Sequence, residues 1–368
     1  MELQNFITER ELNTFEKIKD VFTSDPFFME VKGDDNSCIL LSTTKSPNTK
    51  FIRTSNGCVI DATNKKVVSY FPHIERKEIT NDEESDEKKV DFVKVEELID
   101  GSVVRLYHHN DKWIVATLRT IDASKAYWQS NKSFSDLFYE CNNNRINFDK
   151  LNKNYIYGFI IQHPENKIVT HYNFPDIIHI MTINREDFKE VEYEIELINT
   201  ELKLLRPKQL IFNDYNQLLK SCKQLYHYIP GYLVTLADGT KTKFIAPHYT
   251  FVKSLKGNTP KIDVRYLQMR NDKRQVNDLL LYYPELIEMV NIIESNIINE
   301  ARSLHRKYVA IKIYKQWHDL TSIEKMIIYK IHEKYLQTKN PVDFQTVYSV
   351  ISEIPYYKLA MLLKIPLH

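Results

Sequence analysis

Residues 94–128 read KVEELIDGSVVRLYHHNDKWIVATLRTIDASKAYW, and this stretch sets the fold class of the chain. Two runs rich in β-branched and aromatic residues lie on either side of Asn110 and Asp111. Because Asn and Asp tolerate the left-handed backbone of a tight turn, the pattern predicts a β-hairpin. Just before the hairpin, strand alternation places positions 94, 96, 98 and 100 on one face of a further strand. We therefore expect antiparallel sheet around this segment.

Further hairpins are predicted on both sides of this stretch. Residues 58–70, CVIDATNKKVVSY, form two β-rich runs around Asn64, and residues 231–245, GYLVTLADGTKTKFI, form two around Asp238 and Gly239. The chain from about residue 36 to about residue 250 is therefore β-rich. Residues 81–89, NDEESDEKK, contain no apolar side chain, which predicts a mobile surface loop.

Helical spacing occurs in two parts of the chain. Over residues 185–227, a stripe of apolar residues predicts an amphipathic helix that Pro207 interrupts. The stripe consists of Val191, Ile195, Ile198, Leu202 and Leu205. From about residue 272 the pattern is helical with few glycines, and Thr321 or Ser322 followed by Glu324 is typical of a helix start. We expect two domains, a core over residues 1–260 and an all-helical domain over residues 261–368.

Composition and charge restrict the kinds of function that the chain can have. Fifty basic and 49 acidic residues give a net charge of +1, so nucleic-acid binding requires local clusters of basic side chains. No stretch approaches the roughly 18 apolar residues of a membrane span, and the N-terminus lacks the apolar core of a signal peptide. The four cysteines form no CxxC pair, which argues against a zinc site or a disulfide scaffold. These features predict a cytoplasmic protein without a membrane partner.

Five segments, in order along the chain, resemble the phage-type ATP-dependent RNA ligases of the covalent nucleotidyltransferase superfamily, which have relatives in large DNA viruses. That family begins its active site with Lys-x-Asp-Gly-Ser, which Asp100, Gly101 and Ser102 match. Residues 117–120 are similar to its Thr-Arg-Gly segment. The other three are FIRTSNGCVIDATNKKVVSYFP, similar to an Arg-Gly strand, YGFIIQHPENKIVTHY, similar to a segment with a Phe-Glu pair, and PGYLVTLADGTKTKFIAPHY, similar to a Glu-Gly strand that leads to Lys-x-Lys.

The resemblance implies an α+β fold, with a ligase-like nucleotidyltransferase core of antiparallel sheets and flanking helices before the helical domain. In this family a lysine amine attacks the α-phosphate of ATP while carboxylates hold the metal and the ribose. Here Leu98 stands at the position of the lysine, and Ile160 and Pro230 stand at the positions of two glutamates. We therefore expect neither a catalytic residue nor a metal site, and ATP and Mg²⁺ as cofactors only if the cleft still functions.

The basic half of the implied site is retained. The candidates for nucleotide or phosphate contact are Arg53, Asp100, Gly101, Ser102, Arg119, Lys241 and Lys243. A second basic cluster, with tyrosines interleaved, lies in the predicted helical domain and could face an RNA backbone. The candidates for RNA contact there are Arg306, Lys307, Lys312 and Lys315. Ordinary solvation of surface residues explains either group nearly as well.

Three functions remain open at this point. The first is a catalytically degenerate ligase-like protein that binds RNA or nucleotide, as part of a viral RNA-processing or transcription assembly in the host cytoplasm or the virion. The second is an active RNA ligase with a relocated nucleophile, for which Lys94 is the candidate because it shares the face of Leu98, roughly 13 Å away along the strand. The third is a structural scaffold that holds a protein partner through the helical domain.

Because Leu98 offers no attacking amine, we expect the purified protein to form no covalent nucleotidyl adduct with ATP or GTP. The measurement is incubation with α-labelled ATP and Mg²⁺, denaturation, and detection of label retained on the protein. An acid-labile adduct that disappears in Lys94→Ala would instead support the relocated nucleophile.

Overall fold

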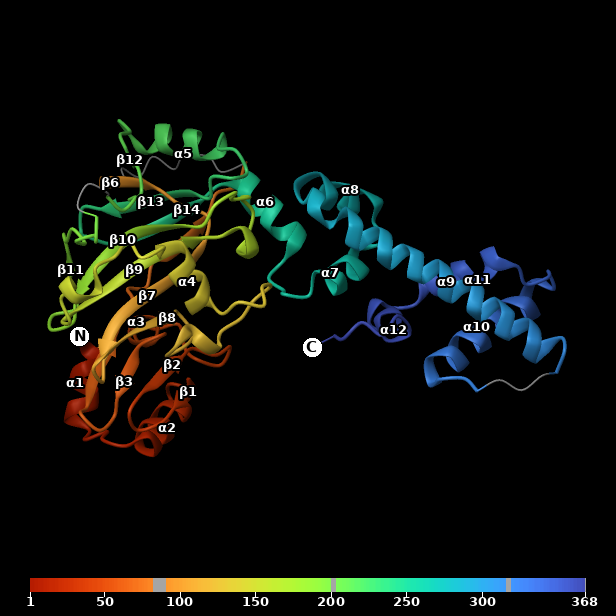
Figure 1. The fold of residues 1–368 in the computed structure, drawn as a ribbon, viewed down its shortest axis with the longest axis horizontal. Helices are drawn as coiled ribbons and strands as arrows, with labels where there is room; N and C mark the ends of the chain where they lie inside the picture. The colour runs from red at the N-terminus through yellow and green to blue at the C-terminus, as the bar shows by residue number, and fades with distance from the viewer. Residues whose placement is uncertain (82–90, 200–202, 316–318, 368) are drawn as a thin grey trace. The chain divides into compact units, whose positions relative to one another are not determined.

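The computed structural model describes residues 1–81, 91–199, 203–315 and 319–367 (Figure 1). The chain divides into two compact units, Met1–Thr250 and Phe251–His368. The first unit contains antiparallel sheets with flanking helices and the second contains helices, so the predicted fold class is confirmed. Apart from Asn81, the loop predicted over residues 81–89 lies outside the described residues. None of the helices in the described ranges is long and apolar enough to cross a membrane.

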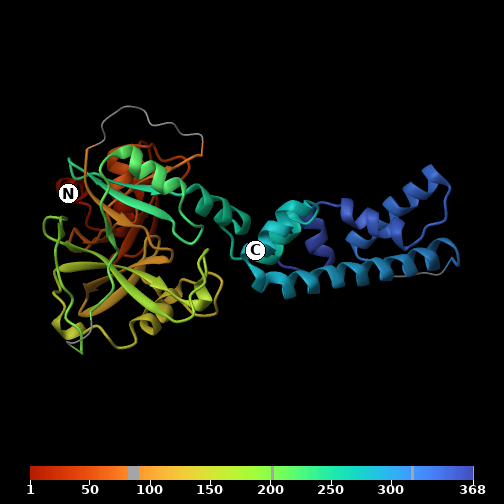
Figure 2. The same cartoon turned by 90° about the horizontal axis from the view of Figure 1, so that it is seen from above.

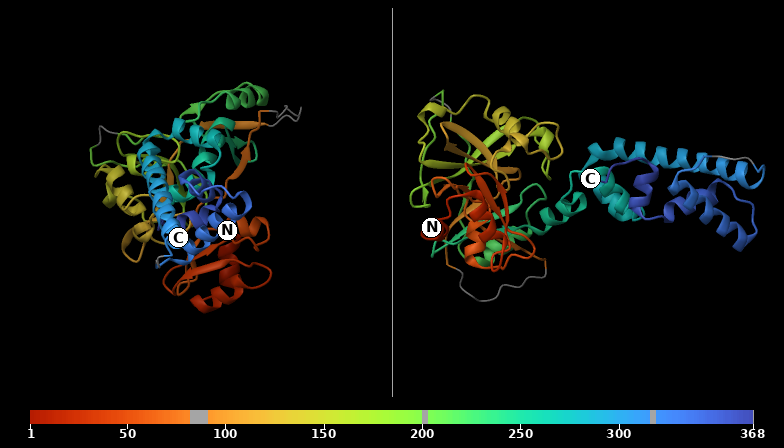
Figure 3. Two further views of the ribbon diagram at one scale, coloured as in Figure 1. Left: turned by 90° about the vertical axis from the view of Figure 1, so that its right-hand side faces the viewer. Right: turned by 90° about the horizontal axis from the view of Figure 1, so that it is seen from below.

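The N-terminal layer of the first unit is a four-stranded antiparallel sheet with helices, and its elements gather together in Figures 1 and 3. The elements are α1 (Glu2–Glu9), α2 (Phe15–Thr23), β1 (Glu30–Gly33), β2 (Cys38–Leu41), α3 (Lys50–Ser55), β3 (Val59–Asp61) and β4 (Lys66–Ser69). One face of this sheet buries Ile7, Ile18 and Phe22 from α1 and α2. Its other face packs Ile39 and Val59 against the second sheet.

The second sheet holds five antiparallel strands in the order β11-β10-β9-β7-β8. Their bounds are β7 (Ser102–His109), β8 (Lys112–Thr117), β9 (Tyr155–Gln162), β10 (Asp176–Asn184) and β11 (Glu190–Val191). The hairpin predicted around Asn110 and Asp111 is confirmed, and both turn residues have positive φ angles, 48° and 57°. Helix α4 (Phe134–Asn142) packs Phe138 against Phe159 of β9, so one face of this sheet is covered. Short 3-10 turns occupy Ala123–Lys125, Phe148–Lys150 and Pro164–Asn166.

The third sheet also holds five strands, in the order β12-β6-β13-β14-β5. Their bounds are β5 (Glu75–Glu78), β6 (Phe92–Glu97), β12 (Gln209–Leu210), β13 (Gly231–Leu236) and β14 (Lys241–Ile245). Helix α5 (Tyr215–Lys223) covers one face, where the ring of Tyr215 packs on Phe244. The turn around Asp238 and Gly239 joins β13 to β14, as predicted. The opposite face carries the side chains of Lys94 and Glu96, described below.

The prediction of helix over residues 185–227 is partly wrong, because the described residues of its apolar stripe are not helical, whereas the helix α5 lies in the last part of the range. Residues 192–199 and 203–208 contain no helix, and α5 begins only at Tyr215, where the side chain of Asp214 accepts a hydrogen bond from the backbone of Gln217. Ile195 and Leu197 are buried two residues apart, which is the period of an extended chain. Isolated β-bridges join Leu197 to Ile146 and Leu205 to Ile178. Ile195 and Leu197 therefore join the core beside the second sheet, and Leu205 pairs with β10, while Leu202 lies outside the described residues.

Helices make up the second unit, together with the 3-10 turn Pro284–Leu286 (Figure 2). After α6 (Pro247–Lys256), which crosses the division, come α7 (Ile262–Met269), α8 (Lys273–Tyr282), α9 (Ile287–Lys312), α10 (Ser322–Thr338), α11 (Phe344–Glu353) and α12 (Tyr356–Leu362). The predicted start of α10 is confirmed. Thr321 and Glu324 form a capping box in which each side chain accepts a hydrogen bond from the backbone of the other.

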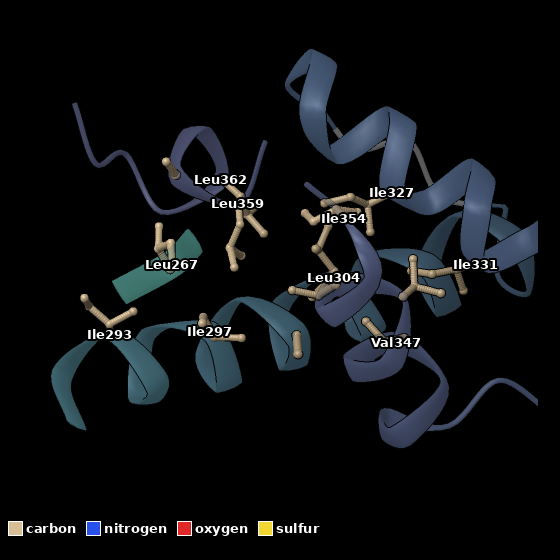
Figure 4. Close-up of a cluster of buried hydrophobic side chains, with 14 of the residues drawn as sticks. Leu267, Ile293, Ile297, Leu304, Ile327, Ile331, Val347, Ile354, Leu359 and Leu362 are labelled. Carbon is tan, nitrogen blue, oxygen red and sulfur yellow. The ribbon is translucent and has the colours of Figure 1, made fainter. Parts of the chain in front are cut away.

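A continuous apolar core holds these helices together (Figure 4). Ile297 and Leu304 of α9, Ile327 of α10 and Val347 of α11 are all fully buried. Because the core contains side chains from five helices, each helix gains most of its stability from packing and not from its own helix propensity.

The four cysteines are free thiols inside the first unit. Cys38 and Cys58 lie in the core of the N-terminal layer, Cys141 lies on α4, and Cys222 lies on α5. Burial raises the pKa of Cys38, Cys58 and Cys141 to about 12 in each case.

Leu304→Ala should destabilise the helical unit by about 2–5 kcal/mol, because the truncation leaves a cavity at a fully buried position. The measurement is chemical denaturation followed by far-UV circular dichroism. Leu281→Ala on α8 is the matched control, since Leu281 is 69% exposed and its truncation should change stability by no more than about 0.5 kcal/mol. Equal effects of the two substitutions would contradict this assignment of the core.

Candidate functional site

Residues 98–101 connect β6 of the third sheet to β7 of the second sheet, so they lie where the two five-stranded sheets meet. The backbone nitrogen of Leu98 donates to the carbonyl of Gly231, at 2.9 Å. A β-carbon on Gly101 would lie 2.5 Å from a methyl carbon of Ile160. Because Pro230 directly precedes Gly231, the three positions that depart from the ligase pattern are brought to one place. All three carry apolar side chains.

Gly231 is required by the geometry of this junction. Its φ angle is +141°, and a β-carbon there would lie 1.8 Å from the carbonyl oxygen of Phe244 on the neighbouring strand. Only glycine permits such an approach without moving β14. The close pairing of β13 and β14 beside Leu98 therefore depends on this residue.

Asp100 is buried and fully engaged in hydrogen bonds within the protein. Its Oδ2 accepts from the backbone nitrogens of Val169 and Thr170, at 2.9 and 2.7 Å, and its Oδ1 accepts from the hydroxyl of Tyr249, at 2.7 Å. Its carbonyl oxygen accepts from the hydroxyl of Tyr172. Sequence reasoning offered Asp100 as a nucleotide contact, but here its carboxylate joins three distant segments of the chain.

Ser102 and Asn166 form a neighbouring polar contact. The Oγ of Ser102 accepts from the side-chain amide of Asn166, at 2.8 Å. The two matching motif side chains, Asp100 and Ser102, thus both have partners inside the first unit.

The basic residues Lys241 and Lys243 share the face of the third sheet that α5 leaves uncovered. The strand register places Lys94 level with Thr235 and Lys241, and Glu96 level with Leu233 and Lys243, so alternation puts all of these side chains on one face. This face therefore carries three lysines and one buried glutamate beside the motif segment.

Carboxylates accompany two of these lysines. The ammonium of Lys241 contacts Glu190 of β11, which belongs to the second sheet, so this ion pair bridges the two five-stranded sheets. The ammonium of Lys94 lies 2.9 Å from the carboxylate of Glu96. The positive charge of this face is therefore partly balanced by groups that the resemblance does not identify.

Arg53 lies on the helix α3, whereas the resemblance placed it on a strand, so that expectation is wrong. Thr49 caps this helix by accepting a hydrogen bond from the backbone of Ile52, and the strand β3 begins only at Val59. The guanidinium donates to the side-chain oxygen of Asn48, at 3.0 Å.

The pKa of His73 responds to two of the basic candidates. Burial lowers its pKa below the usual value of 6.5, the charges of Arg53 and Lys243 lower it further, and Glu75 opposes them. The charges of Arg53 and Lys243, which are far apart in sequence, therefore both act on one imidazole. Arg119 is exposed in the turn after β8, and the adjacent carbonyl of Leu118 lies close to Gly57, near the end of α3.

The predicted basic cluster of the helical unit is divided by the structure. Lys307 forms an ion pair with Glu324, whereas Arg306 is exposed. Lys312 and Lys315 act on a shared neighbour, His332. Burial lowers the pKa of His332, and the positive charges of Lys312, Lys315 and Lys339 lower it further, so all three lysines act electrostatically on this histidine. Lys339 follows α10, the helix that carries His332, whereas Lys312 and Lys315 come from the end of α9, so this grouping depends on how α10 packs against α9.

Metal-binding groups do not gather in the described ranges, since no three His, Cys, Asp or Glu side chains there are placed to hold a common ion.

Comparison with known proteins identifies viral relatives and ligase structures, although no protein-family model matches the chain. The chain is 24% identical over 240 residues to the immediate-early protein ICP-46 homolog of Invertebrate iridescent virus 3, covering 60% of this chain and 51% of that protein. It is 24% identical over 370 residues to the homolog from Invertebrate iridescent virus 6, covering 88% and 78%. The chain thus spans about half the length of the first of these relatives.

Two solved structures illustrate the likeness. An archaeal ATP-dependent RNA ligase is 12% identical with a TM-score of 0.46, covering 78% of this chain and 82% of that one. A mutant Naegleria gruberi RNA ligase with ATP and Mn is 13% identical with a TM-score of 0.31, covering 44% and 52%.

Asp100→Asn should destabilise the first unit by about 1.5–3 kcal/mol, because an amide cannot accept all the hydrogen bonds that the buried carboxylate accepts. The measurement is thermal or urea unfolding, with the exposed Asp149→Asn as the control. Unchanged stability combined with weaker nucleotide binding would show instead that Asp100 contacts the ligand.

Proposed function

We propose that this chain is a ligase-like protein without nucleotidyl-transfer activity, which binds RNA or nucleotide as a component of a viral RNA-processing or transcription assembly. The observation that carries this proposal is the convergence of Leu98, Ile160 and Pro230 at the junction of the two five-stranded sheets. The relatives from two iridescent viruses support the viral setting.

Covalent nucleotidyl transfer requires a nucleophilic amine beside the bound phosphate. Leucine supplies none at position 98, and neither isoleucine nor proline can hold a metal ion at the other two positions. The backbone of Lys94 lies roughly 13 Å from position 98 along the strand, and its amine forms an ion pair with Glu96. This separation argues against the active-ligase alternative.

Binding of RNA requires only that basic groups meet phosphates, and this capacity remains. The charges of Arg53 and Lys243 both act on His73, and Lys241 lies two residues from Lys243 on the same face. Because Glu190 and Glu96 offset part of the positive charge, we expect weak, sequence-independent affinity that depends strongly on salt. The sites in the helical unit around Lys312 and Lys315 would add further phosphate contacts.

The scaffold function is the second candidate, and one observation favours it. Several large apolar side chains of the helical unit are more than half exposed, as at protein-binding surfaces. They include Leu281, Ile292, Ile313, Tyr329, Leu336 and Met361. Absence of RNA binding would make this the better proposal.

Charge reversal of Lys241→Glu together with Lys243→Glu should weaken RNA binding and lower its salt dependence. For single strands the logarithm of affinity changes by about 0.7 per phosphate for each tenfold change in salt, so losing two contacts should reduce this slope by about 1.4. The measurement is a titration of labelled RNA by fluorescence anisotropy at several salt concentrations.

The control for this experiment is the reversal of two exposed lysines elsewhere in the first unit, Lys112 and Lys150, which changes net charge equally. Equal loss of affinity in both double variants would assign the effect to overall charge. No detectable binding of RNA at low salt would contradict the proposed function.

A further inference from the structure

We propose that the paired rings of Tyr226 and Tyr228 form a stacking site for the bases of single-stranded RNA. This inference rests on the proposed function and deepens it, because it identifies a contact for bases beside the basic groups that meet phosphates. The two tyrosines lie in the connection between α5 and β13, four and two residues before Pro230.

The geometry of the two rings suits stacking. Their planes differ by only 3°, and their centroids are 5.6 Å apart. Tyr226 is 65% exposed and Tyr228 is 47% exposed, so both present area to solvent. Aromatic side chains usually bury this area, and parallel exposed rings are the platform on which unpaired bases stack in proteins that bind single strands.

The connection that carries the rings is held in place from two sides. The backbone nitrogen of Ile229 donates to the carbonyl of Tyr226, and the hydroxyl of Thr170 donates to the carbonyl of Tyr228, each at 3.0 Å. The backbone nitrogen of Thr170 in turn donates to the carboxylate of Asp100. The backbone that carries the rings is therefore linked through Thr170 to the buried carboxylate of Asp100. Because this connection is already ordered, binding of a base would cost little conformational entropy.

The groups beside the rings are basic. The imidazole of His227 packs edge-on to Tyr228 at 5.6 Å and lies 5.4 Å from the ring of His248. After burial, the groups that lower the pKa of His227 are His248 and Lys167, both of which bear positive charge when protonated. A base stacked on the tyrosines would therefore place its phosphate beside two imidazoles that can donate hydrogen bonds and within the electrostatic influence of Lys167. This complementarity favours a nucleic acid over an apolar peptide segment.

An oligonucleotide without bases distinguishes the contribution of the stacking site to affinity from that of the basic face. The probes are a labelled uridine-rich RNA of about 12 nucleotides, an abasic oligomer of the same length and charge, and the DNA counterpart. The native protein should bind the RNA at least about fivefold more tightly than the abasic oligomer, since stacking on one aromatic ring contributes at least about that factor.

The double variant Tyr226→Ala, Tyr228→Ala should bind both oligomers equally, with an unchanged salt dependence. The phenylalanine double variant at the same positions should retain the preference for bases, because it keeps both rings. Tyr127→Ala is the matched control, since Tyr127 is also exposed, at 56%, and lies on a different segment. Thermal unfolding of each variant establishes that the first unit remains folded.

The outcomes distinguish this inference from the proposed function. Reversal of Lys241 and Lys243 should weaken both oligomers together and leave their ratio unchanged. If the native protein binds RNA and the abasic oligomer equally, the stacking site is refuted while RNA binding stands. If neither binds, both proposals fail. Similar affinity for RNA and DNA would support stacking, because both carry bases. If the preference for RNA over the abasic oligomer is lost only in the Tyr127 variant, the stacking site is not at Tyr226 and Tyr228.

Discussion

The first unit depends on one buried carboxylate. Burial of an ionised group is costly unless hydrogen bonds replace its water, and Asp100 meets this condition with donors from Val169, Thr170 and Tyr249. These donors come from segments far apart in the chain, so the charge fixes how the motif strand, the loop after β9 and the start of α6 meet. The positions that departed from the ligase pattern lie beside this junction, and their apolar side chains do not disturb it.

Local chemistry explains which parts of the fold could be predicted from sequence. Asn110 and Asp111 favour a tight turn wherever they stand, and a Thr321–Glu324 capping box forms within one helical turn. The segment after β11 was predicted wrongly because its apolar residues fit a helical period by coincidence. Ile195 and Leu197 are instead buried against residues of β7, β9 and β10, which lie outside this segment of the sequence.

In the candidate site, too, contacts between residues far apart in the chain could not be predicted from local sequence. The motif order did not indicate the ion pair of Lys241 with Glu190, which joins two sheets. It also placed Arg53 on a strand when a threonine cap begins a helix there. The parallel rings of Tyr226 and Tyr228 carry no sequence signal beyond two tyrosines in a connection, because their exposure and angle are set by distant partners.

The distribution of the cysteines allows unfolding of the first unit to be followed by thiol chemistry. All four lie in the first unit and are buried, and the raised pKa values of Cys38, Cys58 and Cys141 keep those thiols protonated near neutral pH. Since the thiolate is the reactive form, alkylating reagents reach them only when that unit unfolds. The rate of thiol alkylation therefore reports the unfolding of the first unit alone, because the helical unit contains no cysteine.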